Sequence, residues 1–97
     1  MIRPEDRFTK NPEIIHRRMK DEFVLLPIHP KKETTRPFYF FEEVGGRIWE
    51  LLDGDRACRK IVEEIALEFG VREVRIEGEV FAFLNDLEKE DLIRRLP

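Results

Sequence analysis

The sequence predicts an α+β fold of the winged helix-turn-helix type, with a three-stranded antiparallel sheet followed by three helices. Three short apolar segments, separated by a polar turn and a longer polar loop, indicate the strands. Three longer segments with apolar residues at helical spacing follow them, and glycines lie next to the ends of the first two. A chain of 97 residues has the length of one domain, so we expect these elements to share one core.

The first two strands are expected at residues 14–19 and 23–28, as a hairpin around the polar turn Lys20-Asp21-Glu22. The preceding residues 1–12 are polar and contain two prolines, which indicates a flexible N-terminal arm. The folded domain is therefore predicted over residues 13–97.

The third strand, after a loop at residues 29–35, consists of four consecutive aromatics, Phe38-Tyr39-Phe40-Phe41. Successive side chains of a strand point to opposite faces, so a half-buried strand alternates apolar and polar residues. Four aromatics in a row indicate that both faces leave water. We expect Phe41 to close the core at the corner before the first helix, and the other three to divide between the core and a partner. The sequence leaves open which of the three face the partner.

The first two helices follow from apolar residues on one face and from their stop signals. The first is expected to bury Val44, Ile48, Leu51 and Leu52 and to end at Asp53-Gly54. Small residues at Gly45-Gly46 predict that another element approaches the start of this helix closely. The second is expected to begin at the N-cap Asp55, to bury Ile61, Ile65, Ala66 and Phe69, and to end at Gly70.

The third helix is predicted over residues 77–89, after an extended connection at 71–76. Its apolar residues are Val80, Phe81, Phe83, Leu84 and Leu87. They span an arc of roughly 160°, wider than the roughly 100° that a core-facing helix requires. One alternative is that Phe81 or Phe83 only covers an end of the core, where Leu92 and Ile93 follow. Since the third strand also carries excess apolar surface, we favour a groove between these two elements.

Composition and charge exclude several classes of protein. No apolar run approaches the roughly 20 residues of a membrane span, and the N-terminus lacks a signal peptide, so a cytoplasmic protein is expected. The single Cys58 excludes an internal disulfide and a cysteine-based zinc site. Residues 41–97 carry nine Lys and Arg against fifteen Asp and Glu, which disfavours a nucleic acid partner.

Catalytic, cofactor-binding and metal-binding residues are not expected. The only pairing of a nucleophile with a base is Cys58 with His16 or His29, and these lie on different predicted elements. We interpret Cys58 as a packing residue. Gly45-Gly46 lacks the further glycine and the Lys-Ser/Thr of a phosphate loop, and the carboxylate clusters have no flanking histidines. The sequence therefore favours a binding protein over an enzyme.

Two binding functions fit the outline, peptide capture and DNA binding. An exposed third strand can accept a peptide as an added strand. A winged-helix DNA-binding transcriptional regulator is the alternative, but its recognition helix would need basic or amide side chains. Between Glu77 and Asp91 there are six acidic residues and one basic residue. This charge would repel phosphates, so we favour the peptide.

Four segments of the sequence form a recognisable pattern: FEEVGGRIWELLDG at 41–54, KIVEEI at 60–65, EVFAFLNDL at 79–87 and Leu92-Ile93. Together they resemble the PqqD-like family, the precursor-peptide recognition domains of ribosomally made, modified peptides. The resemblance covers about residues 14–93, and its most specific part is the stretch from Ile48 to Gly54.

The resemblance implies a non-catalytic chaperone that captures the leader of a precursor peptide, as in pyrroloquinoline quinone (PQQ) biosynthesis. The leader would lie as an added strand against the third strand, pack on the third helix and be delivered to a modifying enzyme of the radical SAM type. By position, the implied peptide-binding residues are Phe38, Tyr39, Phe40, Val80, Phe83, Leu84 and Leu87. Neither a cofactor, a nucleic acid nor a membrane is expected as a partner, and the exposed edge would also allow two copies of the chain to form a homodimer.

Overall fold

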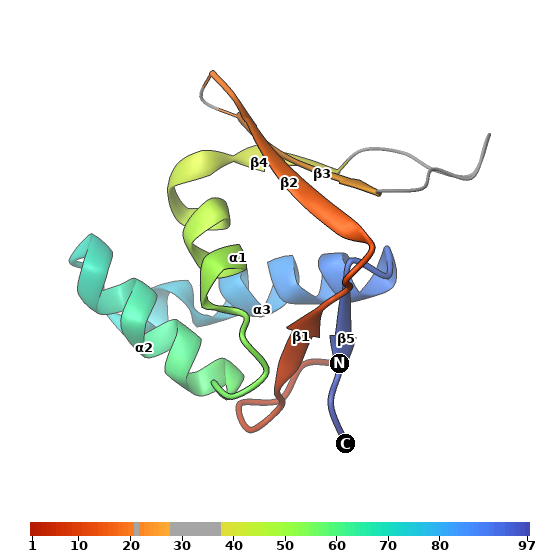
Figure 1. The fold of residues 1–97 in the computed structure, drawn as a ribbon. Coiled ribbons are helices and arrows are strands. Elements are labelled where there is room, and N and C mark those ends of the chain that lie inside the picture. Colours follow the sequence, from red (N-terminus) through yellow and green to blue (C-terminus); the bar gives the residue numbers. More distant parts are fainter. Residues whose placement is uncertain (21, 28–37) are drawn as a thin grey trace.

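A computed structural model describes residues 1–20, 22–27 and 38–97 and shows a mixed α/β fold with three helices and antiparallel sheets (Figure 1). The helices are α1 (Arg47–Leu51), α2 (Cys58–Phe69) and α3 (Glu73–Lys89). The strands are β1 (Phe8–Lys10), β2 (Ile14–Met19), β3 (Glu22–Pro27), β4 (Phe38–Phe41) and β5 (Ile93–Arg95). The predicted order of elements is therefore present, with two strands added at the ends. The likeness to a winged helix-turn-helix stays a prediction.

The strands β2, β3 and β4 form one antiparallel sheet in that order. The turn of the β2–β3 hairpin contains Lys20, whose φ of 60° is the left-handed conformation of a tight turn. The predicted hairpin is thus confirmed, although β3 begins one residue earlier, at Glu22. The predicted loop at 29–35 lies outside the described residues.

The N-terminal segment differs from the predicted flexible arm. Phe8–Lys10 is β1, which pairs antiparallel with β5 at the other end of the chain. Ile2 and Phe8 are buried in the core. The buried carboxylate of Asp6 forms an ion pair with Arg95. The segment is polar along the chain, but its few apolar residues have a partner strand that local sequence patterns do not reveal.

The core lies between the three-stranded sheet and the helices. The predicted inward residues of α1, α2 and the C-terminal segment are confirmed as buried: Ile48, Leu51, Leu52, Ile61, Ile65, Ala66, Leu92 and Ile93. Two predicted core residues differ, because Val44 and Phe69 remain 41% and 37% exposed. Both lie at the rim of a cavity described below.

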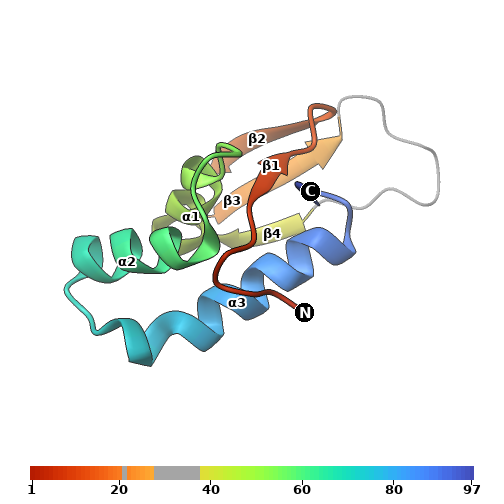
Figure 2. The same ribbon diagram turned by 90° about the horizontal axis from the view of Figure 1, so that it is seen from below.

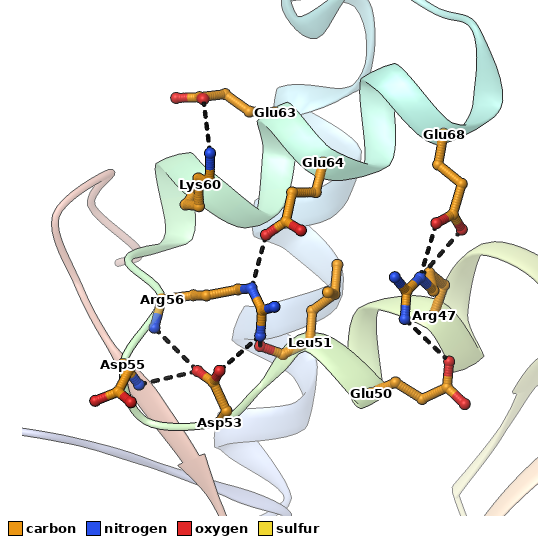
Figure 3. Close-up of polar contacts among 10 residues, drawn as sticks. All are labelled: Arg47, Glu50, Leu51, Asp53, Asp55, Arg56, Lys60, Glu63, Glu64 and Glu68. Carbon is orange, nitrogen blue, oxygen red and sulfur yellow. Dashed lines mark hydrogen bonds and ion pairs between the residues drawn. The ribbon is translucent and has the colours of Figure 1, made fainter.

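The helix boundaries also correct the sequence-based ones. Glu42–Gly46 forms a π-helical turn before α1. The N-cap of α2 is Ala57 rather than Asp55. Figure 3 shows that the Asp53 side chain, at the end of α1, instead accepts bonds from the backbone N–H groups of Asp55 and Arg56, at 2.9 and 3.0 Å. This carboxylate organises the turn between the two helices.

The third helix begins at Glu73, so most of the predicted extended connection at 71–76 is helical. The connection between α2 and α3 is therefore a tight turn. Gly70 ends α2 with a φ of 66°, as its stop signal predicts.

Candidate functional site

Strand β4 is an edge strand. It pairs with β3, and among the described residues no strand pairs with its other edge. Figure 2 shows β4 on the side of the sheet that faces α3. An edge strand presents a row of unpaired backbone N–H and C=O groups, which is a template for one more strand.

Strand β4 pairs with β3, whose side chains are buried on both faces of the sheet. Phe38, Tyr39 and Phe40 lie opposite Leu25, Val24 and Phe23 of β3. These three β3 side chains point alternately to the two faces of the sheet, and all three are buried. Both faces of β3 are therefore covered along its pairing with β4, and the division of the β4 aromatics between core and partner stays a prediction.

The four predicted peptide-binding residues of helix α3 fall into two groups that differ in burial. Val80, Leu84 and Leu87 are at most 2% exposed and belong to the core. Phe83 is partly buried and packs against that core from its margin. Of the four, only Phe83 reaches the surface, because the predicted arc includes the core-facing stripe of the helix as well as its flank.

A cavity of about 560 Å³ lies between the π-helical turn, α1, α2 and α3. Its floor consists of the buried residues Ile48, Ile65 and Val80. Its partly exposed walls are Val44, Phe69, Val71, Ile76 and Phe83. We call this cavity the helix pocket. Sequence reasoning missed it because Val44 and Phe69 have core spacing on their helices.

Polar contacts join α1 to α2, two of the helices that line the helix pocket. Arg47 of α1 donates from Nε to both carboxylate oxygens of Glu68 on α2, at 2.9 and 3.1 Å (Figure 3). Arg56 bonds to Glu64 of α2 at 2.7 Å and to Asp53 at 2.6 Å. These arginines join α1 to α2. Gly45 also lines the pocket, and the predicted close approach of another element at Gly45-Gly46 stays a prediction.

The described residues form no arrangement suited to nucleophilic chemistry. Burial raises the pKa of the Cys58 thiol to about 12, so the thiol stays protonated. His16 stacks on Phe23, with ring centroids 5.0 Å apart, and His29 lies outside the described residues. Within the described ranges, no three His, Cys, Asp or Glu side chains gather as a metal site would require.

The charge of α3 disfavours docking on DNA. Over Glu73–Lys89 the helix carries five acidic residues and two basic ones, Arg75 and Lys89. The helix begins earlier than predicted and therefore includes Arg75, but its net charge is still negative. A surface of this sign repels a phosphate backbone.

The family model of coenzyme PQQ synthesis protein D (PqqD) matches residues 22–93, which is most of the chain. The chain belongs to the PqqD family. The match includes the β3–β4 pair and all three helices, and it ends at the start of β5. The strand β1, which pairs with β5, precedes the matched residues.

A solved structure resembles this PqqD family member closely. It is described as TbiB1 in complex with the TbiA(beta) leader peptide, and it superposes with a TM-score of 0.70 at 28% sequence identity. The alignment covers 89% of this chain and 94% of TbiB1. A search of curated protein sequences found no match. None of the helices among the described residues has the length and apolar character that crossing a bilayer requires.

Proposed function

We propose that this PqqD family member is a non-catalytic chaperone that binds the leader of a ribosomally made precursor peptide as an added strand on β4. The observation that carries the proposal is the edge position of β4 in a fold that superposes on leader-bound TbiB1. Backbone hydrogen bonds along the edge would supply affinity for any extended peptide, and side-chain contacts beside it would supply specificity.

The proposed contacts divide between backbone and side chains. Phe38, Tyr39 and Phe40 provide the edge, and Phe83 on α3 provides an apolar contact beside it. Val80, Leu84 and Leu87 support this surface from inside, because their burial in the core fixes the position of α3.

The bound leader is then presented to a modifying enzyme, of the radical SAM type in the PQQ pathway that gives the family its name. We place this exchange in the cytoplasm, where ribosomal peptides are made. Since an edge strand can also pair with its own copy, a homodimer through β4 would compete with the leader.

Titration of the full chain with synthetic leaders encoded near its gene tests the proposal. We expect at least one leader to bind with a Kd below about 100 μM, which corresponds to about 5.5 kcal/mol, while its scrambled version does not. Absence of binding by every such leader would overturn the proposal. Retention on duplex DNA that falls steeply with salt would favour the regulator instead.

A proline scan of β4 tests strand addition itself. In a strand, alternate N–H groups point to opposite edges, so single substitutions Phe38→Pro, Tyr39→Pro and Phe40→Pro should alternate in effect. Those that remove an outward N–H should weaken leader binding with little change in thermal stability. Those that remove a bond to β3 should lower the melting temperature. Leader affinity that no proline changes would contradict addition to this edge.

A further inference from the structure

The helix pocket exceeds what packing of this domain requires. Its volume of about 560 Å³ compares with roughly 150 Å³ for a cavity that takes up benzene. Pockets of roughly 300–1,000 Å³ are typical of ligand sites. The helix pocket can therefore hold an aromatic side chain and still has room for a second apolar group.

The mouth of the pocket is apolar and accessible. Val44, Phe69 and Val71 are exposed by 41%, 37% and 43%, and they come from three different segments that meet there. Three large apolar side chains around one opening favour an occupant that removes them from water.

Two carboxylates, Glu43 and Glu79, also line the pocket, and they narrow the choice of occupant. Both are exposed, and neither takes part in an ion pair among the residues that the structure describes. Glu68, by contrast, is neutralised by Arg47. An apolar opening flanked by two uncompensated negative charges fits an apolar group that is accompanied by a cation.

The pocket lies next to the segment that follows β4, since the π-helical turn after this strand lines it. Glu43 follows the last residue of β4, Phe41, by two positions, and the π-helical turn to which Glu43 belongs contacts both β4 and β3. An added strand advances by about 3.3 Å per residue. A peptide that runs along β4 and past Phe41 would therefore reach the pocket mouth within a few residues.

We propose that the helix pocket binds a large apolar side chain of the leader, from a position next to a lysine or arginine that Glu43 and Glu79 attract. This inference rests on the proposed function, since it assigns sequence specificity to the peptide that β4 binds. The recognised ligand is thus an extended segment with an apolar residue and an adjacent cation.

Selection of random 12-residue displayed peptides on the full chain tests the inference without a known leader. We expect one position restricted to large apolar residues, with lysine or arginine enriched beside it. In the synthetic consensus peptide, replacement of the apolar residue by serine should weaken binding about tenfold. Replacement of the basic residue by glutamate should weaken it about threefold to fivefold on the wild-type protein. In the Glu79→Lys variant of the protein, the peptide with glutamate in place of its basic residue should bind more tightly than the consensus peptide.

Matched variants of the protein locate the contact. Val71→Asp places a carboxylate in the pocket mouth and should weaken the consensus peptide about tenfold. Val74→Asp is the control, because Val74 is 79% exposed and does not line the pocket. Glu77→Lys, exposed on the same helix, is the control for Glu79→Lys. Equal effects of Val71→Asp and Val74→Asp, or no preference for an apolar residue, would overturn the inference.

A backbone N-methylated consensus peptide separates this inference from the proposed function. If N-methylation abolishes binding but Val71→Asp does not weaken it, strand addition stands and the pocket inference is wrong. If Val71→Asp weakens binding but N-methylation does not, the pocket is a peptide site and strand addition is wrong. If no displayed peptide binds, both are wrong.

Discussion

At the scale of single residues, Cys58 shows how burial decides reactivity. It begins α2, where a helix N-terminus by itself would favour the thiolate. The residue is fully buried, and its backbone N–H donates to the Asp6 carbonyl at 2.8 Å. Burial, followed by the negative charge of Asp6, raises the pKa of the thiol to about 12. Desolvation therefore has a larger effect on the pKa of this thiol than the helix N-terminus has.

We expect Cys58 to resist alkylation in the folded protein. At pH 8 the rate with iodoacetamide should be limited by opening of the structure, and denaturant should raise it by orders of magnitude. Mass spectrometry over time, with and without urea, measures this. Modification of the native protein as fast as of a free thiol would contradict the buried position.

Asp6 joins the two ends of the chain through an ion pair. Its carboxylate pairs with Arg95, which also bonds to Glu88 at 2.9 Å. Burial works to raise the pKa of Asp6, but the bond from the Arg3 N–H and the charges of Arg95 and Arg3 outweigh it. The pKa of Asp6 therefore lies below its ordinary value, and the ionised form stabilises the fold.

The pH dependence of stability should follow from this lowered pKa. Because the folded pKa lies below the unfolded value of about 3.9, the stabilisation is present above about pH 4 and is lost as the pH falls further. Asp6→Asn should lower the free energy of unfolding at pH 6, and this difference should shrink towards pH 2. Urea denaturation at both pH values measures it. A difference in the free energy of unfolding that is independent of pH would contradict stabilisation by the ionised Asp6 carboxylate.

At the scale of elements, α3 has one stripe in the core and one flank at the surface. Leu84 and Leu87 are completely buried, whereas Phe83 lies at the margin and lines the helix pocket. Neighbouring apolar residues on one helix can therefore serve stability and recognition separately. The width of the apolar arc indicates that both roles exist, but not where the boundary lies.

Phe83→Asp should weaken binding of the leader or the consensus peptide about tenfold while the domain remains folded. Circular dichroism and anisotropy titration read fold and binding separately. Ala82→Asp is the control, because Ala82 is exposed on the same helix and does not line the pocket. Unfolding by Phe83→Asp would instead place Phe83 in the core.

At the scale of the whole molecule, the N-terminal segment completes the domain. Phe8 is 1% exposed, and β1 pairs with β5 across nearly the full length of the chain. The guanidinium carbon of Arg95 lies 5.1 Å from the centroid of the Phe8 ring. Asn11 donates from its side chain to the Asp91 carbonyl at 2.8 Å. These contacts join the N-terminal segment to the residues that follow α3.

Phe8→Ala should destabilise the domain by about 3–5 kcal/mol, because it removes a buried aromatic side chain and leaves a cavity. Urea denaturation measures the loss. Leu67→Ala is the control, since Leu67 is 85% exposed. A loss below about 1 kcal/mol would mean that the N-terminal segment is dispensable for the core.

The sequence reveals what depends on neighbours along the chain. The strand at Phe23-Val24-Leu25 and the left-handed stop at Gly70 reflect local residue type and backbone preference, and both are present in the structure. The pairing of β1 with β5 is not local, because its two partners are separated by most of the chain. No periodic pattern within residues 1–12 could indicate it.

The same distinction holds for the candidate site. The sequence by itself determined the order of elements, the aromatic strand and the acidic third helix, since each follows from residue type and spacing. Only the tertiary structure decided that Val80 faces the core, that Val44 and Phe69 border a pocket, and that β4 lies at an edge. Spacing determines which side chains share a face, but what covers that face depends on segments that meet only when the chain folds.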